Sequence, residues 1–135
     1  MPIRVLIADD HDLFAEALAA VLAAEGLECV AHARDGAEAV RLARTFEPDV
    51  VLMDVHMPGP DGIEATQRLR VEKPSLPVVM VSSSSDPDDV ARAGSAGAVG
   101  YLVKDLGFGE LVDVIRKVFS PRAAPSCGGG AAALP

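Results

Sequence analysis

The chain has 135 residues, a formal net charge of −8 and 50% hydrophobic residues. This length suits one domain with a substantial core, and this hydrophobic content argues against an intrinsically disordered chain. So acidic a protein is a poor electrostatic match for nucleic acid or for an anionic lipid surface. No apolar run approaches the ~20 residues of a membrane span, and acids interrupt the N-terminus too early for a signal peptide. We therefore expect a cytoplasmic protein that makes no membrane interaction.

Short apolar runs typical of strands alternate with helical patterns along the chain. The predicted strands cover residues 3–8, 27–33, 49–53, 77–81 and 99–103. The predicted helices follow these runs and end near Gly26, Phe46, Pro74, Gly97 and Phe119. The third run is almost wholly apolar, as expected for a central parallel strand that is buried on both faces. The fourth helix contains Gly94 and soon meets Gly97, so we expect it to be short and marginal.

Five strands that alternate with five helices predict an α/β fold with a doubly wound parallel sheet. For five strands we expect the flavodoxin-like (βα)5 arrangement, with strand order 2-1-3-4-5. The predicted domain covers residues 1–119. Residues 120–135 are rich in Pro, Gly and Ala without apolar periodicity, which indicates a flexible linker or tail.

Polar groups follow four of the predicted strands. Asp9 and Asp10 come after the first, Asp54 after the third, Ser82 after the fourth and Lys104 after the fifth. Ligands of such sheets bind outside the carboxyl ends of the strands, near the switch in strand order. Each residue alone has an ordinary interpretation as a helix cap, a turn residue or a solvated charge. All of them together at strand ends indicate one shared site.

The chemistry of this site follows from its charges. Three neighbouring carboxylates raise one another's pKa unless a cation compensates them, and Mg²⁺ prefers oxygen ligands while it keeps coordination positions open. A carboxylate can act as a nucleophile and form an aspartyl phosphate. The ammonium of Lys104 would then neutralise charge on the transferring group, and the hydroxyl of Ser82 would hydrogen-bond the attached phosphoryl group.

Several motifs carry a resemblance to a known family: LIADDH, VVLMDVHMPGPDGIEA, VVMVSS and GAVGYLVKD. Over residues 1 to about 119 the chain resembles the receiver domains of two-component response regulators. It looks most like the branch that usually carries a C-terminal LuxR-type helix-turn-helix effector. The resemblance implies a phosphoacceptor switch that catalyses only its own phosphoryl transfer and dephosphorylation, so it is not an enzyme in the ordinary sense.

The resemblance also implies a role for each site residue. Asp54 would be the phosphoacceptor, assisted by Lys104. Mg²⁺ or Mn²⁺ would be bound directly by Asp10, Asp54 and the backbone carbonyl of His56, and through water by Asp9. Ser82 would provide the switch hydroxyl, and Tyr101 would be the aromatic residue that reorients with it.

The resemblance implies a sensor histidine kinase as partner. Members of the family can also form homodimers, so a second copy of the chain is another candidate partner. DNA would be contacted only through a helix-turn-helix effector outside this chain, and the resemblance favours a domain of a longer regulator over a stand-alone receiver. The sequence departs from the family pattern at Asp105, where many members have proline. His56 and Ser84 occupy variable rim positions that tune phosphoryl lifetime in the family. His11 and His32 are expected to be surface or packing residues.

Three alternatives come from other classes. A haloacid-dehalogenase-like phosphatase needs a second Asp two residues after the nucleophile, where this chain has His56. A flavodoxin-like cofactor carrier needs a phosphate-binding loop after the first strand, where the acids would repel phosphate. A pseudo-receiver would bind partners without phosphorylation, and the intact acidic set argues against it.

Overall fold

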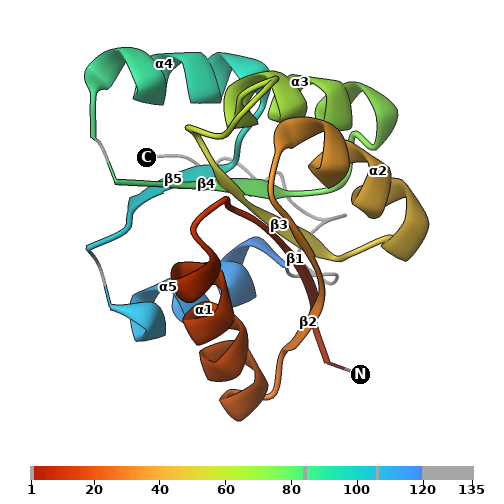
Figure 1. The fold of residues 1–135 in the computed structure, drawn as a ribbon, viewed down its shortest axis with the longest axis vertical. Coiled ribbons are helices and arrows are strands. Elements are labelled where there is room, and N and C mark those ends of the chain that lie inside the picture. Colours follow the sequence, from red (N-terminus) through yellow and green to blue (C-terminus); the bar gives the residue numbers. More distant parts are fainter. Residues whose placement is uncertain (1, 84, 106, 120–135) are drawn as a thin grey trace.

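The computed structural model describes residues 2–83, 85–105 and 107–119, and there it shows five strands in strict alternation with five helices (Figure 1). The elements are β1 (Arg4–Ala8), α1 (Asp12–Ala24), β2 (Glu28–Ala33), α2 (Gly36–Phe46), β3 (Val50–Asp54), α3 (Gly62–Glu72), β4 (Val78–Ser82), α4 (Pro87–Ala96), β5 (Gly100–Val103) and α5 (Phe108–Val118). The predicted tail, residues 120–135, and the rim residue Ser84 lie outside the described residues.

All five strands are parallel, and their order is β2-β1-β3-β4-β5, which confirms the predicted topology. Every residue of β3 and β4 is buried, as the apolar composition of these strands requires of a sheet covered on both faces. The edge strand β2 is only partly buried. The sequence therefore places the most apolar strands at the centre of the sheet.

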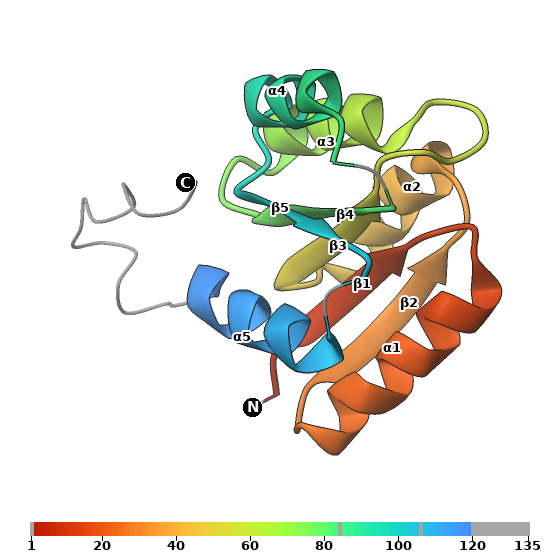
Figure 2. The same ribbon diagram turned by 90° about the vertical axis from the view of Figure 1, so that its left-hand side faces the viewer.

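Helices cover both faces of the sheet, so the molecule has three layers. Helices α1 and α5 lie against one face, and α2, α3 and α4 lie against the other (Figures 1 and 2). Because side chains alternate along a strand, β1 sends Val5 and Ile7 into one core and Leu6 into the other. Fully burying one such side chain contributes roughly 1.5–3 kcal/mol, and both cores depend on many of them.

The helix boundaries follow from local side-chain chemistry. The carboxylate of Asp35 accepts the Glu38 N–H at 2.7 Å and begins α2. Asp61 begins α3 in the same way, accepting the Glu64 N–H at 2.9 Å. Helix α4 has ten residues, the fewest of the five helices, and it ends at Gly97 with a φ of 105°. The expected shortness of this helix is confirmed.

Candidate functional site

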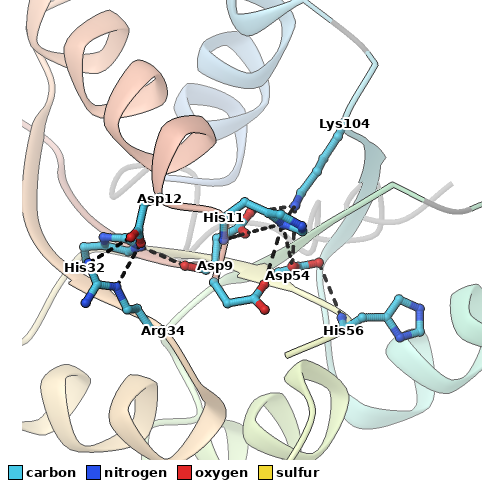
Figure 3. Close-up of polar contacts among 9 residues, drawn as sticks. Asp9, His11, Asp12, His32, Arg34, Asp54, His56 and Lys104 are labelled. Carbon is cyan, nitrogen blue, oxygen red and sulfur yellow. Dashed lines mark hydrogen bonds and ion pairs between the residues drawn. The ribbon is translucent and has the colours of Figure 1, made fainter. Parts of the chain in front are cut away.

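Two buried carboxylates meet a lysine at the carboxyl ends of the central strands (Figure 3). The side chains of Asp9, directly after β1, and Asp54, the last residue of β3, are each 3% exposed. The ammonium of Lys104, directly after β5, lies 2.8 Å from Asp9 Oδ2 and 3.4 Å from Asp54 Oδ2. Three predicted site residues are therefore in contact: Asp9 and Asp54 come from neighbouring strands, and Lys104 reaches them from beyond β4.

Local packing holds the backbone of these residues in place. The Asp9 N–H donates to the carbonyl of Ala33 at 2.9 Å, and His32 Nε2 lies 2.8 Å from the Asp9 carbonyl oxygen. Gly62 begins α3 beside Asp54, and a Cβ at this glycine would collide with the Asp54 backbone carbonyl. The absence of a side chain at Gly62 therefore lets α3 approach the end of β3 closely.

Asp10 and His11 extend the cluster toward solvent. One ligand atom from each of Asp9, Asp10, His11 and Asp54 can be chosen so that all four lie within 4.8 Å of one another. Asp10 and His11 are exposed, whereas the other two are buried. The described part of the chain thus forms an acidic cluster with two buried and two exposed members, called the acidic pocket below.

The environment of Asp54 disfavours its charged form. Burial raises the pKa of this carboxyl, and the negative charge of Asp9 raises it further. The positive charge of Lys104 and a hydrogen bond from the His56 N–H, at 3.4 Å, act in the opposite direction without cancelling the rise. A cation bound among these carboxylates would relieve the repulsion between them.

The donor set fits a hard divalent cation such as Mg²⁺ or Mn²⁺, because it is dominated by carboxylate oxygens. Both oxygens of Asp9 already have partners: Oδ1 accepts the His11 N–H at 2.8 Å, and Oδ2 contacts Lys104. This occupancy suits the predicted contact of Asp9 through water. The oxygens of Asp54 have partners as well, but at the longer distance of 3.4 Å: Oδ1 faces the His56 N–H and Oδ2 faces Lys104. Direct binding of the ion by Asp10 and Asp54 stays a prediction.

The imidazole of His56 lies away from the acidic pocket (Figure 3). Its Nε2 is 3.1 Å from Oδ2 of Asp89, a buried acid on α4. Arg92 contacts the same carboxylate at 3.4 Å and also reaches Asp61 at 3.2 Å, at the start of α3. The loop after Asp54 is therefore tied to α4 through polar contacts.

Ser82 and Tyr101 belong to β4 and β5, on one side of the sheet. Ser82 is fully buried at the end of β4, where its carbonyl accepts the Lys104 N–H at 2.7 Å. Tyr101 pairs with Met80 across the sheet and lines a hollow of about 260 Å³ between α4 and β5. Their predicted switch roles concern a phosphorylated state and stay predictions.

His11 belongs to the pocket, and the sequence reasoning did not include it there. Its side chain is 64% exposed, as expected of a surface residue, yet Nδ1 lies 3.0 Å from Asp9 Oδ1 and 3.1 Å from Lys104 Nζ. The signal that pointed to it was its position directly after the acidic pair. His32 lies beneath the pocket in a packing role, in agreement with its prediction.

The sequence profile of the response regulator receiver domain matches residues 5–116. The chain belongs to the response-regulator receiver family. Receiver domains are regulatory phosphoacceptors rather than conventional enzymes, and they generally bind Mg²⁺ through an acidic pocket. None of the helices in the described ranges is long and apolar enough to cross a membrane.

Relatives and solved structures agree with this membership. The chain is 44% identical over 119 residues to the response regulator GacA of Pseudomonas aeruginosa, an alignment that covers 87% of this chain and 56% of that protein. A LuxR-family two-component response regulator from Aurantimonas superposes with a TM-score of 0.83 at 33% identity, covering 88% of this chain and 86% of that one. This similarity is consistent with the LuxR-type branch.

A third similarity is to a chain of a complex that contains BeF3 and Mg²⁺. The CheX–CheY–BeF3–Mg²⁺ complex from Borrelia burgdorferi contains a chain that superposes with a TM-score of 0.83 at 28% identity, covering 89% of this chain and 91% of that one. The present chain spans only about half the length of the curated relatives it matches. The similarity therefore covers the receiver part of those proteins.

Proposed function

We propose that this receiver domain accepts a phosphoryl group from a sensor histidine kinase onto Asp54, in a reaction that depends on Mg²⁺ or Mn²⁺. The observation that carries the proposal is a buried carboxylate at the end of a central strand, with Lys104 and two further acids around it. Burial and the neighbouring acid Asp9 raise the pKa of Asp54. The negative charges of the pocket are thus incompletely compensated at the position where a divalent ion and a phosphoryl group would bind.

Each pocket residue has a part in the transfer. A carboxylate oxygen of Asp54 attacks the phosphorus while the bond to the donor nitrogen breaks. Lys104 neutralises charge that develops on the phosphoryl oxygens, and its contact at 3.4 Å places it beside the attacking carboxylate. The divalent ion, held by Asp10, Asp54 and the His56 backbone carbonyl and through water by Asp9, would supply further charge neutralisation when bound.

Phosphorylation would then change the outer half of the sheet. The new phosphoryl group adds negative charge and acceptor oxygens at Asp54. Ser82 follows it as a hydrogen-bond donor, and Tyr101 moves into the space that Ser82 leaves. The hollow beside Tyr101 and the short helix α4 make this side of the domain the part that changes shape and partners.

The output is transcription, controlled through a helix-turn-helix effector outside this chain. The similarity to GacA and to a LuxR-family response regulator supports this proposal. In this scheme the receiver, residues 1–119, is joined to its effector through the linker of residues 120–135. The protein acts in the cytoplasm and contacts DNA only through the effector.

Intact mass spectrometry after incubation with acetyl phosphate tests the proposal directly. We expect a mass increase of one phosphoryl group that requires Mg²⁺, is prevented by EDTA and is absent from Asp54→Asn. The variant removes the nucleophile while it keeps the shape of the side chain. A folded wild-type protein that gains no adduct from acetyl phosphate or phosphoramidate would instead support the phosphorylation-independent pseudo-receiver.

A further inference from the structure

A phenylalanine outside the acidic cluster contacts the lysine of the pocket. The ammonium of Lys104 lies 4.8 Å from the centroid of the Phe14 ring. This separation is within the ~6 Å over which a cation is attracted to an aromatic face. Phe14 is part of the first turn of α1 and is half-buried. Nothing in the transfer chemistry described above gives this residue a role.

A second aromatic residue from another helix holds the Phe14 ring in place. The centroids of Phe14 and Phe108 are 5.6 Å apart, and their planes meet at 63°. This edge-to-face geometry is a favoured one for aromatic pairs. Phe108 is the first residue of α5, and both rings pack against the core beneath α1 and α5. The position of the Phe14 ring is therefore set by packing and does not depend on the lysine.

Lys104 needs such support more than the carboxylates do. Its charge sits at the end of a flexible four-carbon stem, whereas Asp9 and Asp54 have short side chains on buried backbone. Its ammonium is closer to Asp9, at 2.8 Å, than to the phosphoacceptor Asp54, at 3.4 Å. During transfer to Asp54 the ammonium must meet phosphoryl oxygens instead. The face of the Phe14 ring attracts the ammonium of Lys104 whether that ammonium contacts Asp9 or Asp54.

We propose that Phe14 is a positioning residue for Lys104. Its ring keeps the ammonium near the carboxyl ends of β1 and β3, where the lysine neutralises charge on the group being transferred. This role rests on the proposed function of Asp54 as phosphoacceptor. It also connects the start of α1 and, through Phe108, the start of α5 to the reacting atoms.

The first test compares rates of phosphorylation by acetyl phosphate with Mg²⁺, followed by intact mass. Leucine retains an apolar side chain without the quadrupole of the ring, whereas tyrosine retains the ring. We expect Phe14→Leu to be phosphorylated about fivefold more slowly than wild type and Phe14→Tyr to stay within about twofold. Phe46→Leu, the same change on the far helix α2, is the matched control and should leave the rate unchanged. Circular dichroism checks that each variant is folded.

A double-mutant comparison separates positioning from a general structural effect. Lys104→Met removes the charge that the ring attracts, so adding Phe14→Leu to that variant should cause no further slowing. The proposal is overturned if Phe14→Leu reacts at the wild-type rate or if Phe14→Tyr is as slow as Phe14→Leu. Equal slowing by Phe14→Leu with and without Lys104 would also overturn it, because the ring would then act through something other than the lysine.

A measurement on the unphosphorylated protein distinguishes this proposal from the proposed function. A ring over the lysine shifts the ε-methylene proton resonances of Lys104 upfield in NMR spectra, and Lys104→Met identifies those resonances. We expect the shift to persist in Phe14→Tyr and to vanish in Phe14→Leu. Phosphorylation without any such shift would overturn the role of Phe14 alone. A shift in a protein that is never phosphorylated would overturn the proposed function and, with it, this role.

Discussion

Asp9 and Asp54 follow or end the almost wholly buried strands β1 and β3, whereas the residues of α4 and β5 are packed less closely. Asp9 and Asp54 sit on a backbone that is closely packed against Ala33 and Gly62. Three of the four residues of β5 are only partly buried, and Gly94 of α4 faces open space. The difference suggests that precise placement of reacting groups and readiness to move are provided by separate parts of one sheet.

Substituting Gly62 tests the tightly packed side and should produce the largest effect on stability. A Cβ in Gly62→Ala would collide with the backbone carbonyl of Asp54 and press on the Met53 side chain. We expect a loss of about 3 kcal/mol in the free energy of unfolding, measured in urea, because overpacking a closed site forces the backbone to shift. The same shift would displace Asp54 and slow its phosphorylation by acetyl phosphate.

The matched control is Gly94→Ala on α4. Apart from the adjacent residues and the backbone of its own helix, no atom lies within 4 Å of the position that a Cβ would take at Gly94. Alanine is favoured over glycine inside a helix by roughly 0.5–1 kcal/mol, so this variant should be more stable than wild type. If Gly62→Ala also unfolded at wild-type urea concentrations, the two sides would not differ in packing and the comparison would fail.

A smaller effect is expected from neutralising Asp54, with a characteristic pH dependence. Because the pKa of Asp54 is raised in the folded protein, the folded state holds more protons than the unfolded state between the two pKa values. The free energy of unfolding therefore falls as pH rises from the unfolded pKa, about 3.9, through the folded one. The Asp54→Asn variant cannot lose stability in this way, so it should be more stable than wild type at neutral pH. Thermal unfolding in the absence of divalent ions measures the difference.

Glu72, whose pKa is shifted in the opposite direction, provides the control for that experiment. The hydrogen bond from Arg44 holds the pKa of Glu72 below its usual range, so this group contributes stability above its unfolded pKa and loses it as pH falls. Glu72→Gln should accordingly be less stable than wild type at neutral pH, and the difference should disappear in acid. Wild-type and Asp54→Asn proteins of equal stability at every pH would show that burial does not penalise the Asp54 charge.

The smallest effect is expected where the loop after Asp54 is tied to α4. Asp89→Asn removes the charge that attracts His56 and Arg92, and such partly exposed pairs contribute about 0.2–1 kcal/mol. We expect faster amide hydrogen exchange in α4 with little change in α3. Asp88→Asn, the exposed neighbour in the same turn, is the control. Unchanged exchange in α4 would mean that the packing of Ala93 and Ala96, rather than the polar contacts, holds this helix.

Much of the fold and of the pocket was predictable because the information is local. Apolar runs such as 49–53 and 77–81 become strands because they bury both faces. Once the strand order is known, the residues at the ends of the neighbouring strands β1 and β3 must lie side by side. Lys104 follows β5, which β4 separates from β3, and it reaches both acids through its long side chain. The contact between Asp9, Asp54 and Lys104 follows from this.

The sequence by itself determined the parallel sheet, its strand order, and which acids and which lysine lie at one end of it. The spacing of apolar residues and the ends of the strands depend on neighbouring residues in the chain, so both can be predicted from the sequence. Only the tertiary structure decided which further side chains reach that end. His11 meets Lys104 across 93 positions, and His56 meets Asp89 across 33. The contact of the Phe14 ring with Lys104 is of the same kind. Such contacts depend on helix placement and side-chain direction, which arise from packing the whole core.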